Sequence, residues 1–216
     1  MNEKKARITI TLPKEMLEAI DRRIDRVFFK NRSHTIECLL AQVIGFQAVR
    51  QAVILLGGKN AEKKVAILAD ILQILKKTEV KNLLIITGKA EPELNQKLEA
   101  YSFNGFSTRF ASSDRGSGGA LKEHHELIST AGPFYVFNTS IFPKKLDLEK
   151  MAKFHHKMGR VATVYQVDAK ENEVYVFEPE ILRYIPNREF VLLEKQVLPE
   201  LFKNRLAILF PKDIKI

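Results

Sequence analysis

Hydrophobic and polar residues alternate at the start of the chain and then change their spacing. From residue 7 to residue 12, Arg and Thr side chains alternate with Ile and Leu, which is the period of a half-buried strand. Pro13 follows, which a first helical turn tolerates, and apolar residues then recur at Leu17, Ile20, Ile24 and Phe28. The chain offers this strand no hairpin partner, so pairing with the same strand of a second copy is the simplest solution.

A second helical pattern begins at Asn31-Arg32-Ser33, where Ser33 is expected to cap the helix. Its apolar positions share one face and are Ile36, Leu39, Leu40 and Val43. We therefore assign residues 1–50 to one domain, made of a strand and two helices, and expect a homodimer through the N-terminal strand.

From residue 51 onward the pattern is different, because continuous apolar runs alternate with helical segments. Runs at 52–56, 82–87 and 134–138 predict buried strands, and periodic stretches at 64–77, 92–100, 120–129 and 146–158 predict helices. Further short strands are expected at 107–111, 162–167 and 174–177. This alternation predicts an α/β domain over residues 51–216, with a mostly parallel sheet flanked by helices.

Composition adds limits on class and location. The 216 residues are 45% hydrophobic and 28% charged, which is typical of a globular protein. No apolar run approaches the ~18 residues of a membrane helix, and the N-terminus lacks a signal-peptide pattern. The single cysteine, Cys38, excludes an intramolecular disulfide. We expect a cytoplasmic protein without a membrane partner.

Positive charge is concentrated in the first domain. The chain has a formal net charge of +9, and residues 1–51 hold ten basic and six acidic residues, a net +4. Such a basic segment suits a phosphate-rich partner.

The N-terminal domain resembles the ribbon-helix-helix family of DNA-binding proteins (the MetJ, Arc and CopG type). The resemblance lies in the order of a strand, a helix that begins at Pro13 and a second helix that begins at Arg32-Ser33. The resemblance implies an intertwined dimer whose ribbon reads double-stranded DNA in the major groove. It implies base or backbone contacts for Arg7, Thr9, Thr11 and Lys5, and a phosphate anchor at Arg32 and Ser33. The competing interpretation of residues 7–12 is an ordinary amphipathic edge strand.

Glycine turns follow the predicted strands of the second domain, where ligands bind in parallel sheets. These turns are Gly57-Gly58-Lys59 and the predicted loop Gly116, Ser117, Gly118 and Gly119; Asn138 ends a third strand. Free amides at such turns can hold phosphate. α/β folds also need glycine there for purely geometric reasons.

The second domain resembles the nucleotidyltransferase fold of the sugar-phosphate nucleotidyltransferases (NDP-sugar pyrophosphorylases). The similar stretches are residues 52–58, 116–121, 133–140 and 173–182. The family's activating loop after the first glycines is missing, and Ser140 stands where the family has a metal-binding aspartate. Asp213 is similar in place to a second metal carboxylate. The departures imply no catalytic residue, no metal and no cofactor.

Two histidine pairs, His124-His125 and His155-His156, do not change this picture. Adjacent helical residues diverge by about 100°, so neither pair chelates a metal from one face. Both pairs are expected on solvated helix surfaces.

Three hypotheses follow for the whole chain. The first is a DNA-binding transcriptional regulator whose second domain is a catalytically inactive sensor of a nucleotide or nucleotide sugar, or an oligomerisation module. The second is an active sugar-phosphate nucleotidyltransferase. The third makes the second domain purely structural.

Overall fold

The computed structural model of the chain describes residues 8–24, 31–44, 48–57, 61–138, 146–166 and 173–211. The chain divides into two compact units, Met1–Ile44 and Gly45–Ile216.

The first unit contains two helices, α1 (Lys14–Asp21) and α2 (Arg32–Ile44). α1 begins directly after Pro13, as the sequence predicts. Arg32 links the two helices, because its Nε and Nη2 donate to the two carboxylate oxygens of Asp21 at 2.8 and 2.6 Å. This hydrogen bond from Arg32 lowers the pKa of the Asp21 carboxyl.

One local prediction for this unit is wrong, and a second is not confirmed. Asn31, rather than Ser33, caps α2, since the Asn31 Oδ1 accepts from the His34 amide at 3.0 Å and Ser33 lies inside the first turn. Residues 8–13 form neither helix nor strand, and Ile8 and Ile10 are 72% and 49% exposed. A strand exists only when paired, and this segment has no strand beside it among the described residues of the single chain. The ribbon-helix-helix fold is therefore not confirmed, and pairing with a second copy stays a prediction.

The second unit is built on one seven-stranded sheet, and the predicted mostly parallel sheet flanked by helices is confirmed. In chain order the strands are β1 (Gln51–Leu56), β2 (Asn82–Thr87), β3 (Ser107–Ser112), β4 (Phe134–Asn138), β5 (Ala162–Gln166), β6 (Glu173–Phe177) and β7 (Ala207–Leu209). Their order across the sheet is β3-β2-β1-β4-β6-β5-β7. Only β6 runs against its neighbours.

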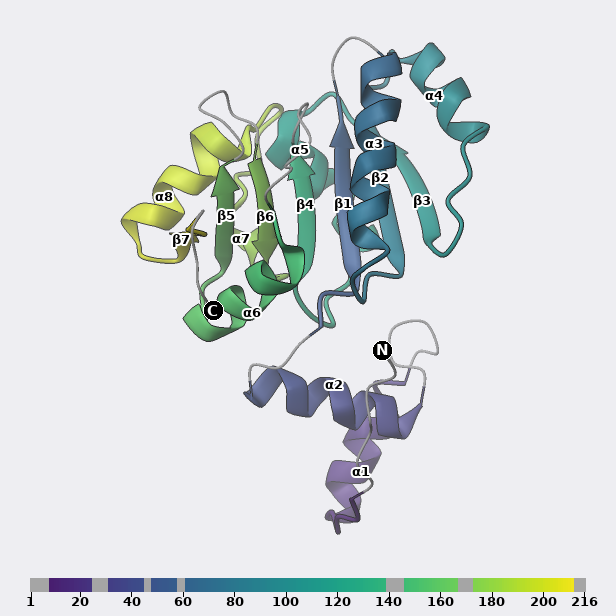
Figure 1. Ribbon diagram of the computed structural model, residues 1–216. Helices are drawn as coiled ribbons and strands as arrows, with labels where there is room; N and C mark the ends of the chain where they lie inside the picture. The colour runs from purple at the N-terminus through teal and green to yellow at the C-terminus, as the bar shows by residue number, and fades with distance from the viewer. Residues whose placement is uncertain are drawn as a thin grey trace. The chain divides into compact units, whose positions relative to one another are not determined.

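Helices cover both faces of this sheet (Figure 1). The helical segments are α3 (Ala61–Leu75), α4 (Pro92–Glu99), α5 (Gly116–Glu123), η1 (His125–Leu127), α6 (Leu148–Met158), α7 (Ile181–Tyr184), η2 (Leu193–Val197) and α8 (Leu198–Lys203). Alternate residues of β1 show the two layers: Ile54 packs with α3, α4 and α6 in one buried cluster, and Val53 packs with α5, α7 and α8 in another. Continuous apolar strands are what a sheet buried on both faces requires.

The carboxyl ends of β1, β2, β3 and β4 meet at one edge of the sheet, because these strands run in the same direction. The chain places β2 and β3 on one side of β1 and then β4 on the other, so the strand order reverses at β1. Ligands of open α/β sheets bind at such a point. In the described part of the chain no helix is both long and apolar enough to cross a membrane.

Candidate functional site

Glycine, amide and carboxylate groups gather at the carboxyl edge of the sheet. Gly57 follows β1, Gly88 and Lys89 follow β2, and Asn138 ends β4. β6 is antiparallel, so its first residue, Glu173, lies at the same edge directly opposite Asn138. The sequence predicted Gly57 and Asn138 at this edge but not Lys89 or Glu173.

The space beside Gly57, directly after β1, is open among the described residues. A Cβ built on Gly57 meets none of the described atoms within 4 Å, and Gly57 itself is exposed. Packing within the described part of the chain therefore does not require a glycine here. Gly58 and Lys59, which were predicted to bind a ligand with it, lie outside the described residues.

The predicted glycine loop at residues 116–119 is instead the first turn of α5, and this prediction is wrong. The amides of Gly118 and Gly119 both donate to the carbonyl oxygen of Val191, at 2.8 and 3.1 Å. A Cβ on Gly116 would lie 2.6 Å from that same oxygen. These glycines permit a close approach by another part of the chain, and two of their amides are not available to a phosphate.

The part of the chain that approaches α5 is the segment 188–193. Ser117, predicted to bind a ligand, accepts a hydrogen bond from the Leu193 amide at 2.9 Å and donates to Glu194 at 3.1 Å. The Val191 amide donates to the Arg115 carbonyl oxygen at 2.8 Å. The site therefore includes a segment more than 70 residues away in the sequence.

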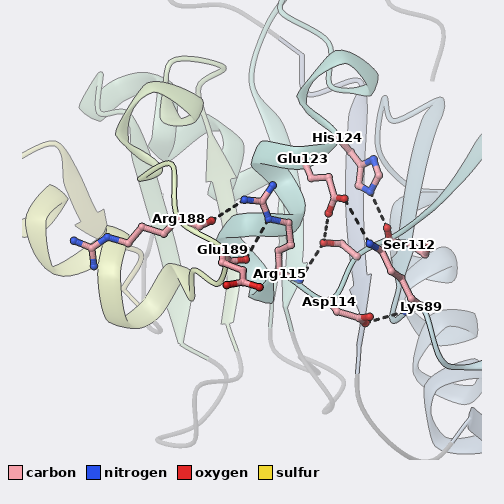
Figure 2. Close-up of polar contacts among 9 residues, drawn as sticks. Lys89, Ser112, Asp114, Arg115, Glu123, His124, Arg188 and Glu189 are labelled. Carbon is pink, nitrogen blue, oxygen red and sulfur yellow. Dashed lines mark hydrogen bonds and ion pairs between the residues drawn. The ribbon is translucent and has the colours of Figure 1, made fainter.

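A polar cluster connects the turn after β2 to α5 (Figure 2). The backbone amide of Lys89 donates to Asp114 at 2.9 Å, and the side-chain ammonium of Lys89 lies 3.9 Å from Glu123. Ser113 donates to Glu123 at 2.6 Å, and this hydrogen bond lowers the pKa of the Glu123 carboxyl, with smaller contributions from the nearby positive charges. The carboxylate is therefore ionised at neutral pH and balances Lys89.

Arg115 joins this cluster to segment 188–193. Its guanidinium donates to the carbonyl oxygens of Arg188 and Glu189 at 2.8 and 3.2 Å, whereas the side chain of Arg188 points away from it (Figure 2). His124, expected on a solvated surface, is half-buried with its Nε2 3.0 Å from the Ser112 carbonyl oxygen. The Arg115 contacts tie the start of α5 to segment 188–193, and the His124 contact ties the end of α5 to the last residue of β3.

A buried network lies beside Asn138. The Tyr175 hydroxyl donates to Glu173, which is 6% exposed, and it also bonds the Asn138 side chain. Burial raises the pKa of Tyr175, and the carboxylates of Glu173 and Glu194 raise it further. Tyr175 therefore stays protonated and orients Asn138 and Glu173 at the edge.

The helices on the α3 side are clamped near the same edge. The Lys64 ammonium lies 2.7 Å from Glu91, with the two side chains 10% and 17% exposed. Gly88 makes room for this pair, because a Cβ there would lie 2.8 Å from Glu91 Oε1. The pair joins the first turn of α3 to Glu91, the residue directly before α4.

One histidine prediction fails at the opposite edge of the sheet. His155 is 1% exposed, and its ring nitrogens lie 2.9 Å from the Thr163 hydroxyl and 3.3 Å from Glu178. Its two hydrogen-bonding partners allow it to be buried, and nothing in this arrangement places it near the carboxyl edge.

The residues predicted to contact DNA are only partly described. Thr9 and Thr11 are exposed and lie outside any strand, and Ser33 is exposed on α2. Arg32 is engaged by Asp21. Lys5 and Arg7 lie outside the described residues.

Sequence reasoning missed the residues that surround the strand ends. The signal for Lys89 was present, because Gly88-Lys89 ends a buried strand in the same way that Gly57 does. Arg115 and Glu123 flank the glycines that the sequence did indicate. Nothing local signals Glu194, whose position depends on the fold of segment 188–193 onto α5.

The described side chains do not supply a metal site. No group of three or more His, Cys, Asp or Glu residues in the described ranges is arranged to hold an ion. Ser140 and Asp213, which the resemblance places at metal positions, lie outside those ranges. Lys89 and Arg115 are cationic groups of the polar cluster at this edge.

No known protein family and no curated protein matches the chain by sequence. Solved structures do match its fold. HddC from Yersinia pseudotuberculosis has a TM-score of 0.54 at 14% identity, covering 75% of this chain and 90% of its own. The 4-diphosphocytidyl-2C-methyl-D-erythritol synthase from Anaerococcus prevotii has 0.54 at 12%, covering 81% and 92%. The inositol-1-phosphate CTP transferase from T. maritima has 0.53 at 11%, covering 77% and 86%.

At such low identity the likeness establishes the fold, and the second unit has a nucleotidyltransferase-like α/β fold. By their names, two of the three are enzymes, a synthase and a CTP transferase. This finding contradicts the hypothesis of a DNA-binding regulator with an inactive second domain.

Proposed function

We propose that the second unit binds a nucleoside triphosphate or a nucleotide sugar over the carboxyl edge of β1, β2 and β4. We further propose that it transfers the nucleotidyl group to a phosphorylated acceptor. The observation that carries the proposal is the open space at Gly57, which follows β1 where the strand order reverses and where no described atom lies within 4 Å of a built Cβ. A glycine in this setting lets a ligand come close to the backbone.

The structures that share the fold support this choice of ligand. HddC has been solved in complex with GMP-PN, and the names of the other two refer to CTP and to a diphosphocytidyl product. These ligands share a base, a ribose and a phosphate chain.

The residues at the edge suit such a ligand. Lys89 has a side chain 57% exposed and only a long 3.9 Å contact to Glu123, so it can turn toward a phosphate. Asn138, which is half-buried and bonded by Tyr175, offers hydrogen-bonding groups to the hydroxyls of an acceptor. In the transfer, an acceptor phosphate oxygen forms a bond to the α-phosphorus, the bond to the bridging oxygen breaks, and pyrophosphate leaves. Positioning and cationic stabilisation are the main protein contributions to such a step.

The test combines calorimetric titration with each nucleoside triphosphate and a pyrophosphate-exchange assay with sugar 1-phosphates. Lys81 and Lys89 flank β2 at opposite edges of the sheet and are both exposed, which makes Lys81→Met a matched control. We expect Lys89→Met to raise the Kd of the triphosphate about tenfold, since a hydrogen bond to a charged group is lost, and Lys81→Met to leave it unchanged. Failure of the wild-type chain to bind any nucleotide or nucleotide sugar contradicts the proposal.

A further inference from the structure

Segment 188–193 has an unusually well-fixed backbone for a connection without strands. Arg115 binds the carbonyl oxygens of residues 188 and 189, and the amide and carbonyl of Val191 bind Arg115, Gly118 and Gly119. The Leu193 amide binds Ser117. Hydrogen bonds therefore hold the backbone on both sides of Phe190.

The side chain of Phe190 does not share in this packing. Val191 and Leu193 are fully buried, whereas Phe190 is 53% exposed. Its ring touches the chain at Gly116, where a Cβ would lie 3.1 Å from Phe190 Cζ. A single exposed aromatic is common on protein surfaces, but a fixed backbone holds this ring in one place, next to a glycine.

The location of the ring relates it to the proposed site. Gly116 begins α5 at the carboxyl edge, and α5 packs through Ala120 and Leu121 in the same buried cluster as Val53 of β1 and Leu84 of β2. Asp114, two residues before the start of α5, accepts a hydrogen bond from the Lys89 amide at 2.9 Å, so the helix starts beside the turn after β2; Gly57 follows the neighbouring strand β1. A nucleotide with its phosphates at those turns can extend its base toward α5.

We propose that the Phe190 ring stacks on the base of the bound nucleotide and contributes to its affinity. The inference rests on the proposed function and names the residue that holds the base. Every nucleobase has a flat face, and base–aromatic stacking is worth several-fold to over a hundredfold in affinity. The fixed backbone reduces the ordering cost of presenting the ring. Glycine at position 116 leaves the space beside the ring free of a side chain.

The absence of tryptophan in the chain provides a direct probe. Phe190→Trp places a single indole at the site, and Phe202→Trp places one on α8, where Phe202 is 38% exposed. We expect saturable quenching of the Phe190→Trp fluorescence by a nucleoside triphosphate, with a midpoint that matches the calorimetric Kd. The Phe202→Trp control should show no saturable quenching.

Affinity measurements on Phe190→Ala complete the test. We expect its Kd for the nucleotide to rise roughly fivefold or more, while its Kd for inorganic tripolyphosphate, which has no base, stays as in the wild type.

The inference is overturned if the nucleotide Kd of Phe190→Ala is unchanged and the fluorescence of Phe190→Trp is not quenched. In that case the proposed function still stands, because the wild type binds the nucleotide. Equal losses for nucleotide and tripolyphosphate also overturn the inference. If the wild type binds no nucleotide, both proposals fail. Should Phe190→Ala fold poorly, the fluorescence comparison decides alone.

Discussion

Two glycine turns stand at the same edge of the sheet and have opposite explanations. At Gly57 a side chain would meet no described atom within 4 Å, whereas at residue 116 it would collide with the backbone of Val191. The second turn is filled by its own chain, and the first is left open. Glycine in an α/β turn therefore indicates close approach without saying what approaches, and only the surroundings separate a packing glycine from a ligand glycine.

The largest expected effect is on stability at the filled turn. Gly116→Ala places a Cβ 2.6 Å from Val191 O, and the backbone there has φ +76°. We expect a loss of about 3 kcal/mol in the free energy of unfolding, from strain and displacement of segment 188–193. Urea denaturation of Gly116→Ala and of Gly57→Ala makes the comparison, and the second should change by less than about 1 kcal/mol. Equal losses would remove the distinction between the two turns.

At the open turn the expected effect is on binding. Gly57→Val puts a branched side chain over the end of β1, where the ligand is proposed to contact the protein backbone. We expect at least a tenfold rise in nucleotide Kd, about 1.4 kcal/mol, with a melting temperature close to that of the wild type. Calorimetry and thermal unfolding on one preparation measure both. A wild-type affinity in Gly57→Val would move the ligand away from this turn.

A smaller effect tests how α5 holds segment 188–193. Ser117→Ala removes the acceptor of the Leu193 amide and the donor to Glu194. The expected cost is about 1 kcal/mol of unfolding free energy. Ser107→Ala, at an exposed position of β3, is the control and should be neutral. No change in Ser117→Ala would mean that Val191 and Arg115 secure the segment without Ser117.

The smallest effect concerns pH. The pKa of Glu123 is lowered in the folded protein, first by the hydrogen bond from Ser113. A lowered carboxyl pKa contributes stability that is present above the ordinary value of 4.5 and is lost as the pH falls through the folded pKa. We expect Ser113→Ala to raise the pKa of Glu123, as followed by carboxyl NMR, and to weaken the acid dependence of stability below pH 4.5. An unchanged pKa would assign the shift to the neighbouring cations instead.

Much of the second unit was predictable because its strands are continuous apolar runs. The predicted strand 82–87 coincides with β2, and 134–138 coincides with β4. Both are buried on two faces, so no other structure suits their composition.

The errors lie where distant contacts override local preference. Glycine in a helix interior costs about 1 kcal/mol of stability, so the glycines at 116–119 favoured a loop. The helical turn is stabilised instead by two hydrogen bonds that the amides of Gly118 and Gly119 donate to the Val191 carbonyl oxygen. The burial of His155 depends on Thr163 and Glu178 in the same way. At the N-terminus, the alternation of residues 7–12 indicates an apolar face that needs burial. A strand forms there only if a second chain or segment pairs with it.

The hydrogen bonds to Val191 make local opening at the site measurable by amide hydrogen exchange. Its carbonyl oxygen holds the amides of Gly118 and Gly119, so the hydrogens of these amides exchange with solvent only when segment 188–193 lifts from α5. Their exchange rate therefore reports the frequency of local opening at the carboxyl edge. A ligand that bridges α5 and this segment should slow both hydrogens together, whereas a ligand held elsewhere should leave them unchanged.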